Sequence, residues 1–290
     1  MPHRVHQIIS TFDKALSKEA SKYCRLSIQF SQDGFSFCVF DINRNKYCGL
    51  EVYDFHNVST IIVLNAILTE LIQTSDWFKA GFEKTEIIFE TPKSTLVPVA
   101  LFDHNHVADY LKLNHPPDLG EVIGNDLLRQ LDAENVFSMP ETLLTTFREF
   151  FPGAGIHHFS SSLIESLLIR YKYQDANPIV FTNVRKSWLD ILVINKGKLQ
   201  FFNSFRYKEK EDFVYFLIFV FEQLNLNPES VELKLMGEIP KVSPLFDLTY
   251  RYIRNVGFVE RSNGTLYSYI FDEIPHHYYF NLLNLQHCEL

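Results

Sequence analysis

Paired histidines are the residues of this 290-residue sequence whose types and spacing come nearest to metal chemistry. His104 and His106 stand two positions apart beside Asp103, so one loop could supply two metal ligands. Neither this pair nor the adjacent histidines at 157–158 and 276–277 have the HExxH or CxxC…H form that makes a zinc motif specific. We therefore predict no metal site, and a metal-dependent hydrolase around His104 and His106 stays an alternative.

The serine and glycine motifs that would indicate covalent or nucleotide chemistry are incomplete. Serines fill positions 160–162 without a GxSxG elbow around them, and Ser160 fits better as the cap of a helix. The chain has no GxxxxGK(S/T) phosphate loop, and Gly153-Ala154-Gly155 lacks the third glycine of a dinucleotide fingerprint. The common covalent hydrolases, P-loop enzymes and Rossmann dehydrogenases are therefore not indicated.

Composition and charge narrow the class of protein. Hydrophobic residues make up 46% of the chain, and the 27 phenylalanines favour strands and packed cores. The formal net charge of −8 speaks against a nucleic-acid partner, and no apolar run is long enough to insert into a membrane. Four scattered cysteines and the lack of an apolar leader predict a cytoplasmic protein with reduced thiols.

The elements that would position any site begin with a βββαβ unit. Its predicted strands lie at residues 26–31, 35–41, 47–55 and 86–90. Turn residues Gln32-Asp33-Gly34 separate the first two strands. Asn57 is expected to cap a helix that runs to about residue 73 and precedes the last strand.

A second unit of the same order follows about 150 residues later, so the sequence indicates an internal duplication. Its predicted elements are strands at residues 179–184, 188–195, 199–207 and 231–236, with a helix at about 210–224 before the last strand. A gap-free shift of 154 positions matches Val39 with Val193 and Tyr47 with Phe201. Few residues are identical, so the match is one of pattern.

Turn signals divide the chain into halves. Asn177-Pro178 marks the expected boundary, which predicts a first half at residues 1–177 and a second at 178–290. The first half contains a small inserted subdomain at about residues 104–155. Predicted elements there and beyond are strands at 127–131, 135–138, 156–159, 257–260 and 266–271, and helices at 141–150, 160–173, 243–254 and 278–285.

Two βββαβ units joined by a helix resemble the actin-like ATPase fold, a duplicated ribonuclease-H-like domain. The segment LSIQFSQDGFSFCVFD with its continuation NKYCGLEVYDF further resembles a bacterial family, the domain of unknown function 3822 typical of Bacteroidetes. The resemblance covers nearly the whole chain and implies an α/β protein with two mixed sheets flanked by helices. The family has no established activity, and its members are similar in fold to actin-like proteins of cell division and type IV pilus assembly.

The resemblance also implies two hairpin turns that would bind the phosphates of ATP with Mg²⁺. In actin-like ATPases an Asp-x-Gly at each turn lets backbone N–H groups approach phosphate and gives the metal a carboxylate. Aligned hairpins place Gln29-Phe30-Ser31 and Asn183-Val184-Arg185 at these turns, so both carboxylates and both glycines are missing. A ribonuclease-H nuclease, which needs an acidic residue on the first strand, fails at Gln29 as well.

A few residues could still contact a nucleotide: Asp33, Gly34, Asn183, Arg185, Lys186 and Gly237. Asp33-Gly34 is more simply an ordinary β-turn. Arg185 and Lys186 stand where a phosphate would lie. Gly237 keeps one glycine of the pair expected on the adenosine side.

Two hypotheses follow. The first is a non-catalytic actin-like scaffold or protein-interaction module with a degenerate nucleotide site, no cofactor and an unidentified protein partner. The alternative is a switch that binds ATP and Mg²⁺ through the non-standard residues named above. Aromatic clusters at 77–78, 150–151 and 278–280 could mark a partner groove or fill the core, and the oligomeric state stays open.

Overall fold

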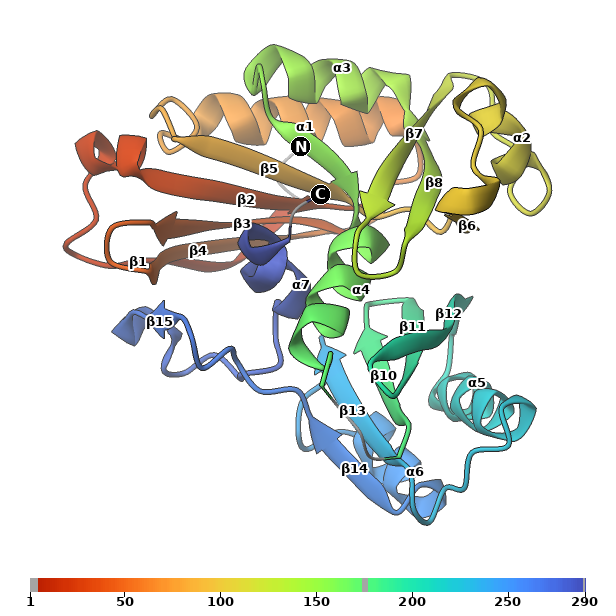
Figure 1. Cartoon of the computed structure of the whole chain (residues 1–290). Helices are drawn as coiled ribbons and strands as arrows, with labels where there is room; N and C mark the ends of the chain where they lie inside the picture. The colour runs from red at the N-terminus through yellow and green to blue at the C-terminus, as the bar shows by residue number, and fades with distance from the viewer. Residues whose placement is uncertain (1–4, 174–176, 289) are drawn as a thin grey trace. The chain divides into compact units, whose positions relative to one another are not determined.

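The computed structural model describes residues 5–173, 177–288 and 290 of the chain (Figure 1). Its strands are β1 (Val5–Phe12), β2 (Cys24–Phe30), β3 (Gly34–Asp41), β4 (Lys46–Phe55), β5 (Lys84–Phe89), β6 (Ser94–Pro98), β7 (Glu121–Leu128), β8 (Ala133–Pro140), β9 (Gly155–His158), β10 (Ile179–Val184), β11 (Trp188–Asn195), β12 (Lys198–Arg206), β13 (Glu232–Gly237), β14 (Asn255–Phe258) and β15 (Leu266–Tyr267). Its α-helices are α1 (Ile61–Thr74), α2 (Val107–Lys112), α3 (Glu141–Phe150), α4 (Phe159–Arg170), α5 (Lys210–Gln223), α6 (Pro244–Tyr252) and α7 (Phe280–Asn284). The twice-predicted βββαβ order is confirmed, as β2-β3-β4-α1-β5 and β10-β11-β12-α5-β13.

The chain forms two compact units that are discontinuous in sequence. Unit 1 comprises Met1–Glu165, Asn263–Glu273 and Asn281–Leu290, and unit 2 comprises Ser166–Ser262 and Ile274–Phe280. Two late segments therefore return to unit 1. The predicted division into residues 1–177 and 178–290 does not assign these two late segments to the first half. It stays a prediction.

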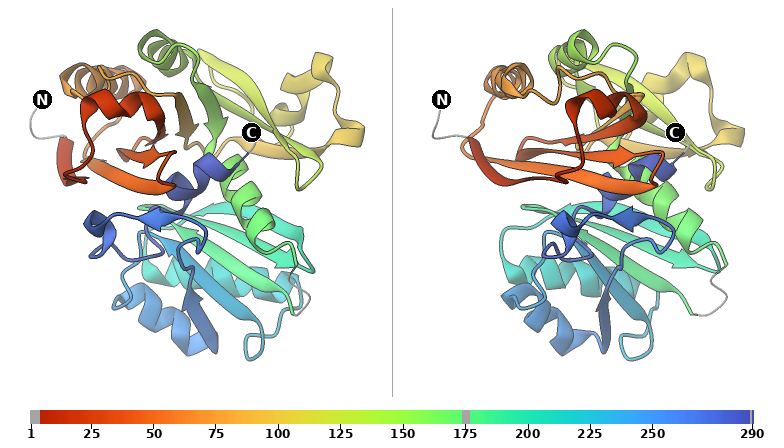
Figure 2. Two further views of the ribbon diagram at one scale, coloured as in Figure 1. Left: turned by 60° about the vertical axis from the view of Figure 1, so that its left-hand side comes forward. Right: turned by 90° about the vertical axis from the view of Figure 1, so that its left-hand side faces the viewer.

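Unit 1 is built on a mixed sheet in the order β1-β4-β3-β2-β5-β9, with β15 beside β4. β2, β3 and β4 form the predicted antiparallel meander, whereas β5 runs parallel to β2 and β9 parallel to β5. Helices α1 and α3 lie side by side along the sheet (Figure 2), and their apolar faces share one core with the strands. Four phenylalanine rings surround Phe30, with centroids 5.4–6.2 Å from its own: those of Phe35, Phe55, Phe89 and Phe147. Much of the phenylalanine excess is therefore core.

Two of the aromatic clusters belong to this core as well. Trp77 and Phe78 pack against it, and so do Phe150 and the buried Phe151. Phe78 makes edge contacts with the rings of Phe37 and Phe151, at centroid distances of 4.8 and 5.5 Å. Of the two roles open to residues 77–78 and 150–151, core filling is the one observed.

The start of α1 differs from the prediction. Thr60, not Asn57, is the N-cap, and its side chain accepts a hydrogen bond from the Val63 N–H at 3.3 Å. Asn57 has a φ of +56°, in the left-handed region, whereas an N-cap residue needs an extended backbone. The connection from β4 to α1 therefore uses Asn57 as a turn residue.

Unit 2 contains a five-stranded sheet in the order β12-β11-β10-β13-β14. β10, β13 and β14 are parallel, and β11 and β12 complete an antiparallel meander. Helices α5 and α6 pack together and bury their apolar faces against the sheet. A Glu209–Asp212 capping box fixes the start of α5, close to the predicted position.

The duplication is visible in the register of the strand pairs. The Cα pairs Leu26–Val39 and Phe30–Phe35 recur 154 residues later as Val180–Val193 and Val184–Leu189. A register shift also follows Val39 where β3 pairs with β4, and it recurs after Val193 where β11 pairs with β12. The two halves thus share strand register where they share almost no residues.

The shift of 154 fails at the third strand of each unit. Four residues lie between the paired Asp41 and Lys46, but only two lie between Asn195 and Lys198. Because the second turn is two residues shorter, Tyr47 corresponds to Leu199 and not to the predicted Phe201. The gap-free alignment was therefore wrong beyond the first hairpin.

A three-stranded antiparallel sheet in the order β6-β8-β7 forms the inserted part of unit 1. Helix α2 packs on it through Leu111, which joins Val97 and Val136 in a small core. The predicted strand at 127–131 in fact ends at Leu128, because the chain then turns through Asp132 at a φ of +55°. The predicted strand at 266–271 is shorter too, since residues 269–271 form a 3-10 helix.

None of the helices in the described part of the chain is long and apolar enough to cross a membrane.

We expect Tyr47→Phe to lower the free energy of unfolding by about 1–2 kcal/mol, measured by urea denaturation. Tyr47 is fully buried, and its hydroxyl donates to the Leu283 carbonyl of α7, which ties the C-terminal segment to β4. The variant leaves that buried carbonyl without its donor. Tyr23→Phe is the control, because Tyr23 is 51% exposed. Equal effects of the two substitutions would contradict this role of Tyr47.

Candidate functional site

The first hairpin corner, between β2 and β3, satisfies its own donors. The Ser31 Oγ accepts hydrogen bonds from the backbone N–H groups of Asp33 and Gly34, at 3.0 and 3.1 Å. The Asp33 carbonyl accepts from the Phe55 N–H at 2.8 Å. A Cβ on Gly34 would stand 2.7 Å from the Tyr53 carbonyl oxygen, so the close approach of β4 requires this glycine. Asp33 and Gly34 thus form a closed turn whose N–H groups bond to Ser31.

The second corner, between β10 and β11, holds a buried ion pair. Asp190 is fully buried and accepts two hydrogen bonds from Arg185, at 2.9 Å from Nε and 2.7 Å from Nη2. Asn183 Nδ2 and Ser204 Oγ donate to the same carboxylate, at 2.9 and 2.6 Å. The guanidinium also lies over the Trp188 ring, 5.9 Å from its centroid. The cation expected to meet a phosphate is therefore engaged in a bidentate pair with the chain's own carboxylate.

Gly237 closes the same corner. Its φ is +86°, and a Cβ there would stand 2.3 Å from the Val184 carbonyl oxygen and 2.8 Å from Asn183 Oδ1. The Gly237 N–H donates to the His277 carbonyl at 2.9 Å. Lys186 is exposed in the turn between β10 and β11. Of the six candidate residues, Asn183, Arg185, Lys186 and Gly237 lie together at this corner of unit 2, and Asp33 and Gly34 lie at the corner of unit 1.

These corners do not fit Mg²⁺–ATP. Magnesium in nucleotide sites takes oxygen ligands and depends on an available carboxylate, whereas Asp190 is 0% exposed and bound to Arg185. Across the described ranges no group of three His, Cys, Asp or Glu side chains could hold a metal ion. His106 lies on the surface and bonds to Asp109 at 3.1 Å.

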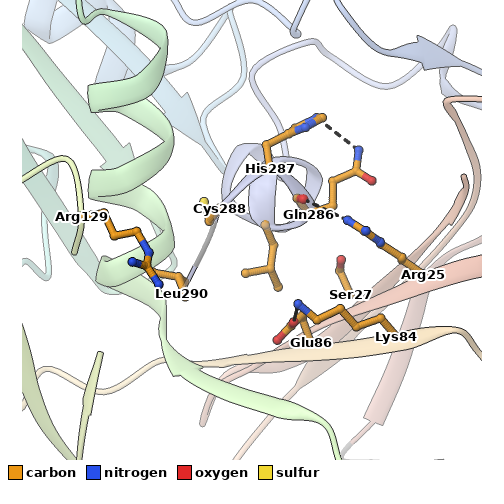
Figure 3. Close-up of a pocket in the computed structure, with 10 residues that line it drawn as sticks. Arg25, Ser27, Lys84, Glu86, Arg129, Gln286, His287, Cys288 and Leu290 are labelled. Atoms are coloured by element: carbon orange, nitrogen blue, oxygen red, sulfur yellow. Dashed lines mark hydrogen bonds and ion pairs between the residues drawn. The ribbon is translucent and has the colours of Figure 1, made fainter. Parts of the chain in front are cut away.

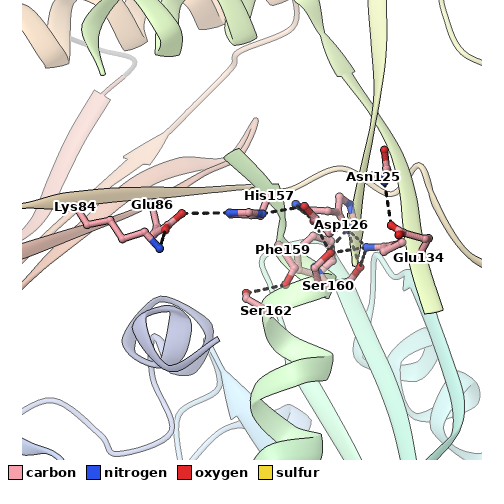
Figure 4. Close-up of polar contacts among 12 residues, drawn as sticks. Lys84, Glu86, Asn125, Asp126, Glu134, His157, Phe159, Ser160 and Ser162 are labelled. Atoms are coloured by element: carbon pink, nitrogen blue, oxygen red, sulfur yellow. Dashed lines mark hydrogen bonds and ion pairs between the residues drawn. The ribbon is translucent and has the colours of Figure 1, made fainter. Parts of the chain in front are cut away.

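A buried polar network in unit 1 centres on His157 of β9 (Figure 4). His157 Nδ1 lies 2.8 Å from Asp126 Oδ1 on β7, and Nε2 lies 3.1 Å from Glu86 Oε2 on β5. Lys84 pairs with the other oxygen of Glu86. Burial lowers the pKa of His157, but the hydrogen bonds and charges of Asp126 and Glu86 outweigh burial and raise the pKa to about 9. An imidazolium therefore joins three strands at neutral pH.

Gly155 makes room for this contact. A Cβ at position 155 would lie 2.0 Å from Glu86 Oε2 and 2.7 Å from His157 Nε2. A side chain at position 155 would therefore displace Glu86 or His157 from the ion pair.

The neighbouring His158 is also buried, at 1% exposure. Its Nε2 lies 2.9 Å from the Thr91 carbonyl oxygen, so this nitrogen carries the proton and Nδ1 accepts from the Ser160 hydroxyl at 2.6 Å. Such a pair has the composition of a nucleophile and its base, but Ser160 is 0% exposed and no substrate reaches it. Ser160 lies in the first turn of α4, so its prediction as the helix cap was wrong.

An apolar groove of about 390 Å³ lies between β7, α3 and β9 in unit 1. Residues that line it include Val122, Ile123, Leu144, Arg148, Ala154 and Ile156. β7 and β9 each stand at the end of their sheet, so each has one edge that pairs with no other described strand.

Hydrogen-bond directions show which backbone groups of β7 face its open edge. On β8 the Ser138 N–H donates to the Lys93 carbonyl, on the side of β6. The backbone N–H and C=O of the preceding residue, Phe137, therefore point to the opposite side, toward β7. Gly124 of β7 is the register partner of Phe137, so its N–H and C=O point toward β8. Along an antiparallel strand, the backbone groups of successive residues point to alternate sides. The N–H and C=O of Ile123 consequently point to the open edge.

The same reasoning applies to β9. The His158 N–H turns away from β5 and donates to the Asp126 carboxylate on β7, at 2.8 Å. Ile156, two residues earlier, presents its N–H and C=O on the same side. The groove is thus flanked by apolar side chains and by two strand edges.

Several groups that build these sites were not among the sequence candidates. The sequence did contain a signal for Asp190. A carboxylate inside the apolar run WLDILVIN needs a buried partner, and Arg185 lies within reach across a tight turn. Asp126 and Glu86 had none, because their meeting at His157 depends on tertiary contacts across 31 and 71 residues.

We expect the His157→Gln variant to change the pH dependence of stability. His157 has a pKa of about 9 in the folded protein against 6.5 for an ordinary histidine. Its ionic contribution is therefore complete below pH 6.5 and is lost as the pH rises through 9. Urea denaturation between about pH 6 and pH 10 should show the wild type losing roughly 3 kcal/mol relative to the variant. His106→Gln, on the surface, is the control, and a wild-type profile parallel to that of His157→Gln would contradict the assignment.

Comparison with solved structures shows an actin-like ATPase fold. A protein of unknown function with that fold from Bacteroides thetaiotaomicron VPI-5482 matches with a TM-score of 0.81 and 24% identity, over 94% of this chain and 99% of the other. The PilM-PilN type IV pilus biogenesis complex matches with a TM-score of 0.62 and 11% identity, over 91% of this chain and 98% of the other. The predicted fold class is therefore confirmed. No curated protein matches the chain.

Sequence comparison identifies the family. A family model described as "Protein of unknown function (DUF3822)" matches residues 13–256, which include both βββαβ units. The resemblance to this family, which the sequence of the first three strands indicated, is thereby confirmed. The chain belongs to the DUF3822 family.

Proposed function

We propose that this protein is a non-catalytic actin-like scaffold that has a degenerate nucleotide site and binds an extended segment of a partner protein. One observation carries the first part of this proposal: at both hairpin corners, groups that would meet a nucleotide are bonded to the chain itself. The Ser31 hydroxyl accepts from the Asp33 and Gly34 N–H groups, and Asp190 accepts from Arg185.

The energetics of the second corner favour this closed state. To bind a phosphate in a two-pronged manner through Nε and Nη2, Arg185 would have to leave a carboxylate that is 0% exposed. Removing one partner of a buried ion pair costs about 3–5 kcal/mol, because the other charge stays buried without its counterion. Without a metal carboxylate the corner also lacks the neutralisation that phosphoryl transfer needs. We therefore expect no ATPase activity.

The groove between β7 and β9 supports the second part of the proposal. An extended peptide could bond to the edge groups of Ile123 and Ile156 and place aliphatic side chains against Val122 and Leu144. Arg148, exposed at the same groove, favours a partner with an acidic residue beside its aliphatic ones. PilM, which shares the fold, was solved in a PilM-PilN complex, so a protein of this fold can bind another protein.

Isothermal titration with ATP and MgCl₂ tests the nucleotide part. We expect no binding heat up to about 1 mM ATP, because neither corner offers free donors and a metal carboxylate together. Micromolar, Mg²⁺-dependent binding would overturn the degenerate site and support the alternative, an ATP switch that uses Asp33, Gly34, Asn183, Arg185, Lys186 and Gly237. In that case Arg185→Ala should abolish binding without unfolding the chain.

Selection from a displayed library of random peptides tests the partner part. We expect the enriched peptides to carry aliphatic residues at alternate positions, as an extended strand against the groove requires. Leu144→Glu places a charge in the groove and should weaken their binding roughly tenfold or more. Ile62→Glu is the matched control, because Ile62 is 78% exposed and lies outside the groove. Failure to enrich any peptide, or equal binding to Leu144→Glu, refutes the groove.

A further inference from the structure

A polar pocket of about 400 Å³ lies elsewhere in unit 1, against the strands β2 and β5 and the C-terminal segment (Figure 3). Lining residues that matter here are Arg25, Ser27, Lys84, Glu86, Gln286 and His287. Arg25 is the second residue of β2, about 16 Å along the strand from its end at the hairpin corner. The pocket is therefore separate from the corner discussed above.

Arg25 is the residue of this pocket whose uncompensated charge indicates a ligand. Its guanidinium has five N–H donors, yet within the described part of the chain it makes a single long hydrogen bond, 3.4 Å from Nη1 to the Gln286 carbonyl oxygen. Arg25 Nε is buried and has no hydrogen-bond partner among the described residues, and no described carboxylate lies within ion-pair distance of the guanidinium. A half-buried cation without a counterion is costly in a folded protein.

A second cation lies directly beside it. Arg25 and Lys84 are register partners on the parallel strands β2 and β5, and like charges in that position repel. Glu86 is the one acidic side chain among the described residues that line the pocket, and both of its oxygens are engaged, by Lys84 and by the His157 imidazolium. Burial and then the charge of Arg25 lower the pKa of His287, as a positive pocket would. Among the described lining residues, three cationic side chains, Arg25, Lys84 and Arg129, thus stand against the single carboxylate side chain of Glu86, although the whole chain carries −8.

We propose that this pocket binds a small metabolite through its phosphate group, with Arg25 and Lys84 as the two cationic contacts. A guanidinium matches the oxygens of a phosphate in a two-pronged manner, and a lysine adds a point charge. The volume suits a small molecule, since ligand pockets usually measure about 300–1,000 Å³. The anion would relieve the repulsion between the two cations and give the Arg25 guanidinium a counterion. This site is independent of the scaffold function proposed above.

Equilibrium dialysis with radiolabelled inorganic phosphate, at constant ionic strength, tests the proposal. We expect the wild type to bind phosphate and the Arg25→Gln and Lys84→Gln variants to bind it roughly tenfold more weakly or worse. Arg44→Gln is the control, because it removes the same charge from a surface arginine of unit 1 that pairs with Asp41. Glycerol phosphate should displace the label, whereas succinate should not.

Folding controls keep the outcomes distinct. In chloride buffer the thermal midpoint of Arg25→Gln should not fall below that of the wild type, because the substitution removes an uncompensated cation. Absence of phosphate binding, or equal binding by Arg25→Gln, would overturn the site. A chain truncated after Cys288 tests self-occupancy: phosphate binding that emerges only after truncation shows that the chain's own end fills the pocket, and it also overturns the proposal. Stronger displacement by succinate overturns the assignment of a phosphate ligand.

Discussion

The contact on which unit 1 most depends is the His157 imidazolium between Asp126 and Glu86. It joins β7 of the inserted sheet to β9 and β5 of the larger sheet, through distances of 2.8 and 3.1 Å. Because it holds two strand edges near each other without pairing their backbones, a groove is left between β7 and β9. The same contact occupies one carboxylate oxygen of Glu86, and Lys84 occupies the other. This full engagement of Glu86 determines the charge of the polar pocket. One buried cation thus shapes both the groove and the polar pocket.

The two hairpin corners share a chemical arrangement that their sequences hide. Gln29 and Asn183 occupy equivalent positions on the first strand of each unit, since each pairs with a residue seven positions later across its hairpin. Each places a side-chain amide where an actin-like ATPase needs a carboxylate, and each donates to a carboxylate on a neighbouring segment, Glu90 or Asp190. An amide can donate to an anion but cannot neutralise Mg²⁺. Both corners have therefore turned their polar groups inward, in two different ways.

Local pattern was enough to predict the strands of the two βββαβ repeats, because turn residues and alternating apolar residues act over a few positions. It could not show that the third strands differ by two residues in their turns, since the register depends on pairing and not on similarity. It also could not show Asn57 in a left-handed conformation or Asp126 beside His157. Candidate residues at the corners were chosen by their position in the hairpins. Their partners Ser31 and Asp190 lie only two and five residues away along the chain, so the sequence carried a local signal for both closed corners.

Charge compensation separates a closed site from an open one in this protein. At the second corner Arg185 has a buried carboxylate as its partner, and that carboxylate accepts four hydrogen bonds from three residues, so nothing at the ion pair demands a ligand. In the polar pocket Arg25 has a lysine as its nearest register partner and a buried Nε with no described acceptor. The unmet charge of Arg25 is therefore stronger grounds for ligand binding than the position of Arg185 in its hairpin.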